Sequence, residues 1–517
     1  MNAPARFACP AVLLLAGVAM TPLAARAQDE GEAAQGEVSA QALVDTGREQ
    51  FNNGEYEEAV QSFSQVVNAL KPQGPSRELL QLLVFRAKAF GQLEEYQAAL
   101  EDLKEALTYA QGAPAVEGEI RNTRGEIYME AGAFELALPD LQAAAQASRS
   151  NAQYQFNLGK AQIKLGIAVQ GEKAISKWID TDEDLPEQRA EALLLRGQAY
   201  TALGKYEQAR TDLADSLAID AEEHEVYFTL ASIALQEENY ADAADQLALA
   251  IENYTPENEE DEYPFVQAYL TRAFALEELG VEADDPTTAA QFFAEGIADC
   301  DFIINDLDED DANAAGSRSA AMFRKGVLQR LQENYSDAVR SFSQALQINP
   351  SLGEAYFRRG ICFFYQGEEL LAIRDFQQAA SINFDSPRSN LWQGMAWAQR
   401  GDYDEAIRAY GEAVAVSDRY IPAFVNRGLA HLQQEDFEKA IADFNEAIRL
   451  QPTEATHYYR RGKAFSLSGE REDAIQSYMN AVAYDPELRP ALVALADELD
   501  ANGQSALSLE YRRRAAQ

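Results

Sequence analysis

The sequence is poor in histidine, cysteine and positive charge. Its 517 residues include three histidines and three cysteines, and no C-x-x-C pair occurs, so the common zinc and redox motifs are absent. Lysine and arginine number 43 against 85 aspartates and glutamates, which gives a formal net charge of -42. Because such a surface repels phosphate groups, nucleic acid is not an expected partner. No metal ion or other cofactor is expected either.

Long hydrophobic runs and the motifs of common enzyme classes are also missing. No apolar stretch reaches the roughly 18 residues that a membrane-spanning helix needs, so membrane insertion is not expected. The sequence contains no G-x-S-x-G elbow, no glycine-rich phosphate loop and no H-E-x-x-H motif. Hydrophobic residues nevertheless make up 47% and charged residues 25%, which is typical of a folded chain. We therefore expect a folded protein that is not an enzyme.

The first 27 residues have the pattern of a secretory signal peptide. Arg6 precedes an apolar run at 11–20 that is too short to span a bilayer, and the small-x-small sequence Ala-Arg-Ala follows at 25–27. The pattern predicts cleavage after Ala27 and leaves residues 28–40 as a linker. The mature protein is expected in the periplasm or outside the cell.

A period of 34 residues runs through the second half of the chain. From residue 321 onward, glycine, alanine and aromatic residues each recur at this spacing. The columns are Gly326, Gly360, Gly394, Gly428 and Gly462; Ala338, Ala372, Ala406, Ala440 and Ala474; Phe342, Phe376, Tyr410, Phe444 and Tyr478; and Ala345, Ala379, Ala413, Ala447 and Ala481. A fixed period of this length indicates stacked supersecondary units.

Each unit is predicted to be a pair of antiparallel helices. Residues 423–433 and 437–450 are good helix formers, and each segment has one apolar stripe at i, i+3, i+4 and i+7 spacing. Small Gly428 and Ala440 are expected where the two helices approach most closely, with Phe444 filling the space beside them. One pair cannot bury its stripe alone, whereas stacked pairs can.

The residues of one such unit carry a resemblance to a known family. The residues that match the family's pattern are Phe424, Gly428, Phe437, Ala440, Phe444, Ala447 and Pro452. This pattern is similar to that of the tetratricopeptide repeat family, and the resemblance implies an all-α, right-handed superhelical solenoid of about 13 stacked helix-turn-helix units over 41–517. Arg427 stands where leucine is usual, as do Arg359 and Arg461, and we interpret these arginines as tolerated near an exposed helix edge.

Breaks in the period predict two arrays. The first covers 41–254 and includes a degenerate unit near 151–179. A regular array with a capping helix covers 320–517. Between them, 255–319 is expected to be an irregular acidic joint that holds a degenerate repeat with an insertion at 281–288.

Two features near this joint invite a more specific interpretation. Asp306, Asp308 and Asp310 alternate as at the start of a calcium loop, but the required glycine and final glutamate are absent, so a solvated loop is favoured. Cys300 and Cys362 would survive signal cleavage in an oxidising compartment. Because they lie two repeats apart, beyond the roughly 7 Å that a disulfide allows between alpha carbons, each is expected to be a packed thiol.

The resemblance also implies a concave groove lined by the first helices, where the family binds peptide segments or protein partners. The predicted apolar groove residues are Phe323, Phe357, Ile361, Leu391, Met395, Val425, Leu429 and Tyr459. The predicted polar groove residues are Arg324, Arg358, Trp392, Asn426, Arg460 and Lys463. Two alternatives stay open: the apolar side chains pack between neighbouring helices, and the arginines pair with carboxylates of the same chain.

These observations predict an exported, non-enzymatic scaffold or adaptor that binds protein or peptide partners within periplasmic or envelope complexes. An alternative is a substrate-recruiting accessory subunit of an envelope enzyme system, for polysaccharide export or peptidoglycan handling. The identity of the partner separates the two.

Overall fold

The computed structural model describes residues 40–181, 185–254, 266–307 and 314–516. Over these ranges the chain forms twenty-six α-helices and one short 3-10 helix, and no strand. None of the described helices is long and apolar enough to cross a membrane. The predicted signal peptide, residues 28–39 of the predicted linker, and the acidic stretches 256–262 and 308–311 lie outside the described residues.

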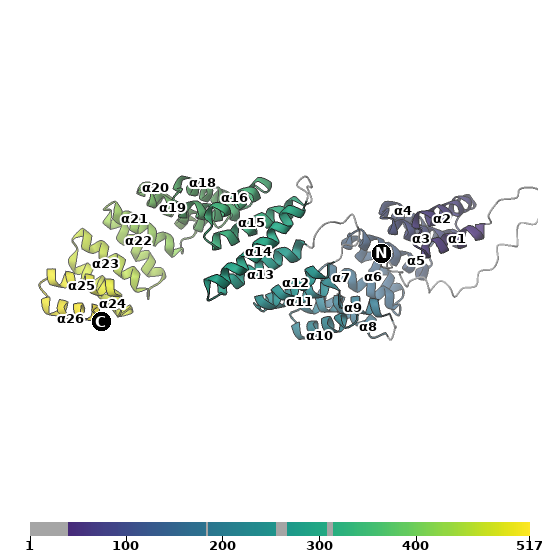
Figure 1. Ribbon diagram of the computed structural model, residues 1–517, viewed down its shortest axis with the longest axis horizontal. Helices are drawn as coiled ribbons and strands as arrows, with labels where there is room; N and C mark the ends of the chain where they lie inside the picture. Colours follow the sequence, from purple (N-terminus) through teal and green to yellow (C-terminus); the bar gives the residue numbers. More distant parts are fainter. Residues whose placement is uncertain (1–39, 182–184, 255–265, 308–313, 517) are drawn as a thin grey trace, which may run out of the picture. The chain divides into compact units, whose positions relative to one another are not determined.

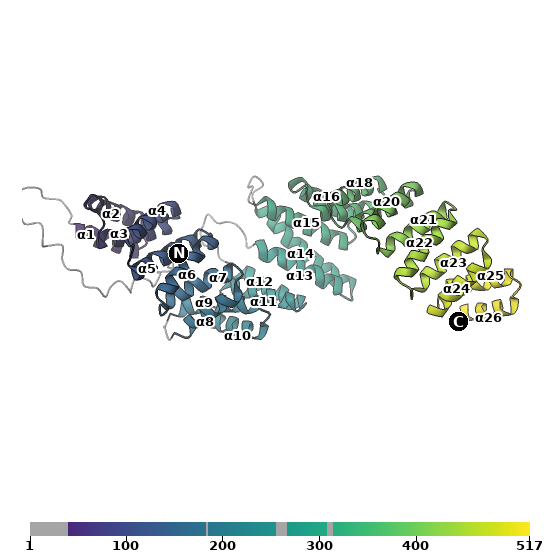
Figure 2. The same ribbon diagram turned by 180° about the vertical axis from the view of Figure 1, so that it is seen from behind.

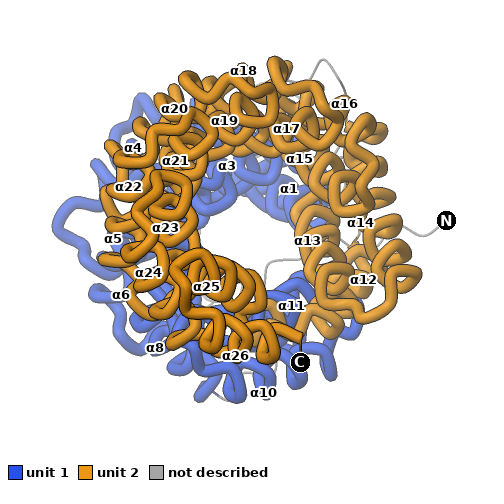
Figure 3. The backbone as a smooth tube through the Cα atoms, turned by 90° about the vertical axis from the view of Figure 1, so that its left-hand side faces the viewer, with its two compact units in different colours: residues 1–233 blue, residues 234–517 orange. Residues whose placement is uncertain are grey.

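The chain divides into two compact units, residues 1–233 and 234–517, which are coloured separately in Figure 3. The boundary falls within α11 (His224–Gln236), ahead of the predicted joint at 255–319. Unit 1 contains α1 (Ala40–Asn52), α2 (Tyr56–Leu70), η3 (Lys71–Gln73), α3 (Arg77–Gln92), α4 (Tyr96–Tyr109), α5 (Pro114–Glu130), α6 (Phe134–Ala147), α7 (Ala152–Lys164), α8 (Ala168–Ile179), α9 (Pro186–Ala202) and α10 (Tyr206–Leu217).

Unit 2 contains the helices of the regular array and those of the repeat before it. They are α12 (Tyr240–Glu252), α13 (Val266–Glu282), α14 (Pro286–Asp306), α15 (Ala315–Leu331), α16 (Tyr335–Ile348), α17 (Gly353–Tyr365), α18 (Glu369–Ser381), α19 (Ser386–Gln399), α20 (Tyr403–Val416), α21 (Ile421–Gln433), α22 (Phe437–Leu450), α23 (Ala455–Ser468), α24 (Arg471–Tyr484), α25 (Arg489–Ala501) and α26 (Ser505–Ala515).

Within each unit the helices follow one another as antiparallel hairpins, each packed on the next (Figures 1 and 2). An odd-numbered helix begins each pair and an even-numbered helix completes it, so α1 to α10 form five pairs in unit 1 and α13 to α26 form seven pairs in unit 2. The predicted helix-pair solenoid is therefore confirmed, and the number of described helices agrees with about 13 units.

The glycine column makes room for the aromatic column within each pair. A Cβ atom on Gly428 would lie 2.8 Å from Cε1 of Phe444, closer than real side chains approach, and a Cβ on Gly394 would lie 2.4 Å from Cε1 of Tyr410. Phe444 and Ala440 are both fully buried. The predicted close approach of the two helices at Gly428 is confirmed.

The two degenerate units keep the helix pair by other means. In α7 and α8 the aromatic pair is Phe156 and Trp178, whose ring centroids are 5.3 Å apart inside the core. In the other unit the predicted insertion lengthens the helices to 17 residues in α13 and 21 residues in α14, and only residues 283–285 connect them. The extra residues therefore extend existing helices instead of forming a separate loop.

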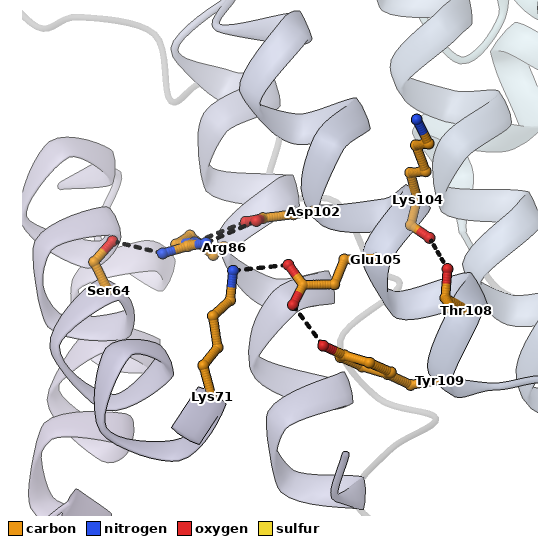
Figure 4. A network of polar contacts seen from close by, with 8 residues as sticks. All are labelled: Ser64, Lys71, Arg86, Asp102, Lys104, Glu105, Thr108 and Tyr109. Atoms are coloured by element: carbon orange, nitrogen blue, oxygen red, sulfur yellow. Dashed lines mark hydrogen bonds and ion pairs between the residues drawn. The ribbon is translucent and has the colours of Figure 1, made fainter. Parts of the chain in front are cut away.

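The arginines that precede the small-residue column are paired and mostly buried. Arg86 donates from Nε and Nη2 to both carboxylate oxygens of Asp102, at 2.7 Å each, and from Nη1 to Ser64 (Figure 4). Six repeats have an arginine–aspartate pair of this kind, and the aspartate side chain in each is only 5% to 8% exposed. The pairs are Arg86–Asp102, Arg124–Asp140, Arg196–Asp212, Arg272–Asp299, Arg359–Asp375 and Arg427–Asp443.

The interpretation of Arg359, Arg427 and Arg461 as tolerated at an exposed helix edge is therefore wrong. Arg359 and Arg427 bridge the two helices of their own pairs, and Arg461 donates from Nε to Ser477 Oγ at 3.2 Å across the same interface. Burial raises the pKa of Asp375, and the hydrogen bond from Arg359 opposes that shift. Each bridge thus offsets the cost of a desolvated carboxylate by close charge-assisted hydrogen bonds.

The first helices of unit 2 lie along the inner side of a curved array, and the second helices lie outside them (Figure 3). First helices of successive pairs also contact one another directly, as α13 contacts α15 and α19 contacts α21. Within the described residues, Cys300 and Cys362 are buried free thiols, as predicted, and burial raises the pKa of each to about 12.

Candidate functional site

A cavity of about 460 Å³ opens on the first helices of unit 2. Its walls come from α13, from α15, and from the segment between α16 and α17. The lining residues are Gln267, Leu270, Thr271, Phe274, Gly316, Ser319, Ala320, Phe323, Arg324, Asn349 and Leu352. This volume lies in the range of roughly 300 to 1,000 Å³ that ligand sites occupy.

The residues of α13 in this cavity were missed by the sequence analysis because the insertion hides the 34-residue period. The signal that would have found them is the pair Arg272–Ala273. Arg272 forms the buried bridge to Asp299, so Ala273 stands where other units have glycine. With that alignment Leu270 and Phe274 occupy the fifth and ninth positions, which the family resemblance assigns to the groove. Both line the cavity.

Arg324 is the charged residue that lines the cavity. Its Nη1 forms an ion pair with Oε2 of Glu277, and its guanidinium carbon lies 5.2 Å from the centroid of the Phe274 ring. Burial raises the pKa of Glu278, and so do the carboxylates of Glu277 and Glu282, while Arg324 opposes the shift. The charged side chain that lines this mostly apolar pocket, Arg324, is therefore already paired with Glu277. Such a site suits an aliphatic or aromatic side chain of a bound segment.

The predicted apolar groove residues fall into two groups. Phe357, Ile361, Leu391 and Val425 are buried, with exposures of 3%, 9%, 7% and 8%. The first three belong to hydrophobic clusters shared with neighbouring helices. Phe323, Met395 and Tyr459 are partly buried, and Leu429 is exposed. Phe323 lines the cavity. The buried group can shape the inner surface, whereas the other four can contact a bound segment.

The predicted polar groove residues are mostly engaged within the chain. Besides the Arg324 pair, Arg358 Nη2 lies 2.6 Å from Oε1 of Glu354. Asn426 donates from Nδ2 to the Pro422 carbonyl at 2.8 Å. The remaining polar groove residues are Trp392, which packs edge-on against Phe364 at 5.4 Å, Arg460, which donates to Thr456 Oγ1 at 3.3 Å, and Lys463, which is exposed.

Over the described ranges, no group of three or more histidine, cysteine, aspartate or glutamate side chains is placed to hold a metal ion. The alternating aspartates Asp308 and Asp310 lie outside those ranges.

The sequence matches family models described as tetratricopeptide repeat over more than half of its length. The matched residues are 122–186, 194–258, 323–386 and 370–421 for one model, 421–454 for a second and 455–488 for a third. No curated protein matches the sequence significantly.

Several solved structures are similar over part or most of the chain. A crystal structure of MamA protein is 21% identical, covers 33% of this chain and 94% of its own, and has a TM-score of 0.32. The hetero-tetramer Cut9–Hcn1 of the APC/C is 16% identical, with coverages of 87% and 95% and a TM-score of 0.35. Yeast Tom70 is 15% identical, with coverages of 90% and 96% and a TM-score of 0.34.

Proposed function

We propose that this chain, which belongs to the tetratricopeptide repeat family, is a non-enzymatic scaffold that binds segments of partner proteins on the inner surface of unit 2. The observation that carries the proposal is the cavity between α13 and α15. Its walls combine apolar Leu270, Phe274 and Phe323 with one ion pair at the rim. Interfaces concentrate binding energy where an anchor side chain enters a desolvated pocket.

The proposal includes a location. The signal-peptide pattern at residues 1–27 supports export, so the partners would be proteins of periplasmic or envelope complexes. N-terminal sequencing of the protein purified from its producing cell tests this part. A mature chain that begins at Gln28 agrees with export, and an intact Met1 contradicts it.

Binding is tested by comparing two truncations of apolar side chains. Phe323→Ala removes one wall of the cavity, whereas Val416→Ala truncates a residue that is 58% exposed at the end of α20. Each variant and the parent are used to purify partners from the envelope fraction of the producing cell, and the captured proteins are quantified by mass spectrometry. Proteins that Phe323→Ala loses and Val416→Ala retains are the expected result. Identical captured sets would contradict the proposed site.

A further inference from the structure

Four aromatic rings meet where α16, α17 and α19 approach one another. Tyr335 and Tyr365 stack with centroids 5.4 Å apart, and Phe364 lies 5.4 Å from Trp392. Tyr365 also contacts Phe364 at 5.7 Å and Trp392 at 6.4 Å. These residues, here called the four-ring patch, link three helices of unit 2 in one continuous aromatic surface.

The four-ring patch is open to solvent on the side of Tyr365. Tyr365 is 58% exposed, and Leu370 and Leu371, at the start of the next helix, are 57% and 37% exposed. Gln366 donates from Nε2 to Ser336 Oγ at 2.8 Å, which ties the end of α17 to the start of α16. A group of exposed apolar side chains held in a fixed position is more typical of a binding site than of the rest of a protein surface.

Unpaired negative charge borders the four-ring patch. Glu333 and Glu368 are exposed in the turns that precede Tyr335 and follow Tyr365. Burial is the largest cause of the raised pKa of Tyr335, and the negative charge of Glu333 raises that pKa further. The carboxylate of Glu333 therefore influences the hydroxyl of Tyr335. Neither glutamate forms an ion pair or a side-chain hydrogen bond within the described part of the chain. A cation that binds here could contact both the exposed ring of Tyr365 and free carboxylates.

The same part of unit 2 already stacks its own arginines on aromatic rings. The guanidinium carbon of Arg388 lies 4.9 Å from the centroid of Phe357, and that of Arg359 lies 5.9 Å from the centroid of Phe363. Arg400 lies 5.8 Å from the ring of Trp397 in the same way. The planar guanidinium of arginine stacks on aromatic faces and forms forked hydrogen bonds to carboxylates, whereas the ammonium of lysine is a compact, strongly hydrated charge.

We propose that the four-ring patch binds a basic segment of a partner protein by an arginine side chain that stacks on Tyr365 and faces Glu333 and Glu368. The inference rests on the proposed scaffold function, because it names the chemistry of a segment that unit 2 binds. An acidic protein with a formal charge of -42 attracts basic partners over its whole surface. The four-ring patch adds a preference for arginine over lysine that charge alone does not provide.

The test uses fluorescein-labelled nine-residue peptides with three arginines, three lysines or three citrullines, each separated by Gly-Ser, and a proline-rich peptide of the same length. Fluorescence anisotropy measures their affinities for the full-length protein at low salt. The parent is expected to bind the arginine peptide roughly two- to five-fold more tightly than the lysine peptide, which is the range for one exposed cation–π contact. The neutral citrulline and proline-rich peptides are expected to bind more weakly than either basic peptide.

Matched variants show which residues produce the preference for arginine over lysine. Tyr365→Ala is expected to abolish the arginine preference and Tyr365→Phe to retain it. Tyr484→Ala, which removes a tyrosine that is 50% exposed elsewhere in unit 2, is also expected to retain it. Glu333→Gln should weaken binding of the arginine peptide more than Glu435→Gln does. Glu435 occupies the same turn position three repeats later, with a φ of 59° against 60° at Glu333.

Equal affinities for the arginine and lysine peptides would overturn the proposal, and so would an arginine preference that survives Tyr365→Ala. Tighter binding of the proline-rich peptide would instead assign the four-ring patch to a different class of segment. The scaffold function is tested separately by the capture experiment with Phe323→Ala. If Phe323→Ala loses partners but the parent shows no preference for the arginine peptide, the scaffold function is supported and the arginine-binding proposal is refuted.

Discussion

Arg427 Nη2 lies 2.6 Å from Oδ1 of Asp443, sixteen residues further along the chain on the other helix of the same pair. The side chain of Asp443 is 7% exposed and that of Arg427 is 24% exposed. This bridge recurs at the same spacing in other repeats of both units. It fixes the first helix of a pair against the second by directional hydrogen bonds, in addition to the apolar contact of Gly428 with Phe444.

Removing one partner of this bridge is expected to destabilise the repeat. Arg427→Ala leaves the buried carboxylate of Asp443 without its cation, which costs about 2 to 4 kcal/mol. The double variant Arg427→Leu, Asp443→Leu is expected to recover most of that loss, because two apolar side chains need no partner. The measurements are the urea transition midpoint and amide hydrogen exchange in α21 and α22.

Arg449→Ala is the matched control for the bridge. Arg449 pairs with Glu446 on the surface, where the two side chains are 61% and 44% exposed, so its loss is expected to change stability by less than about 0.5 kcal/mol. Equal destabilisation by Arg427→Ala and Arg449→Ala would contradict a special role for the buried bridge.

Two helical glycines of unit 2 are expected to respond to alanine in opposite directions. Gly428→Ala places a Cβ 2.8 Å from the Phe444 ring, so the helix pair must open, at a cost of about 1 to 3 kcal/mol. A Cβ on Gly411 in α20 meets only Arg427 Nη1, at 3.7 Å. Gly411→Ala should therefore stabilise the protein by up to about 1 kcal/mol through helix propensity. Parallel urea melts check both values, and a shift of the same sign in both variants would refute the steric account.

His457 is expected to make the protein less stable as the pH falls below neutrality. The side chain is 5% exposed, and neither ring nitrogen has a hydrogen-bond partner in the described structure. Burial lowers the pKa of His457 and Arg460 lowers it further, while Glu454 opposes them. Because the folded-state pKa lies below the unfolded value of about 6.5, the stability of the neutral ring is fully present above that pH and declines below it.

The variant His457→Leu isolates this contribution from the titration of the many carboxylates. Between pH 7 and pH 5.5 the urea midpoint of the parent is expected to fall further than that of the variant. The NMR titration of the His457 ring is expected to give a pKa below 6.5. Identical pH dependences for parent and variant would show that the ring finds a partner when it is protonated.

The fold was predictable from the sequence because its packing is periodic. The residue types of Gly428, Ala440 and Phe444 recur every 34 residues, because these positions make the same contact between the two helices of each unit. The arginine bridges were equally periodic but were misread. A single arginine before a glycine looks like a surface residue until the aspartate sixteen positions later is read with it.

The candidate site was only partly predictable. Phe323 and Arg324 were identified from repeat positions, and both line the cavity. Leu270 and Phe274 were missed because the longer helices of the irregular repeat shift the register. The burial of Phe357 depends on its contacts with the rings of Phe384 and Trp392, and Leu391 lies in a cluster that includes Ala423 of the next repeat. A position-by-position pattern does not include such contacts.

The most direct test of the account is site-specific photo-crosslinking in the producing cell. A benzoylphenylalanine at Thr271 faces the cavity on α13, whereas the same residue at Arg408 lies on α20, an outer helix of unit 2, where the side chain is 68% exposed (Figure 3). If the inner surface binds partner proteins, illumination yields a discrete crosslinked protein from position 271 and none from position 408. The same adducts from both positions, or none from position 271, would contradict a binding site on the inner surface of unit 2.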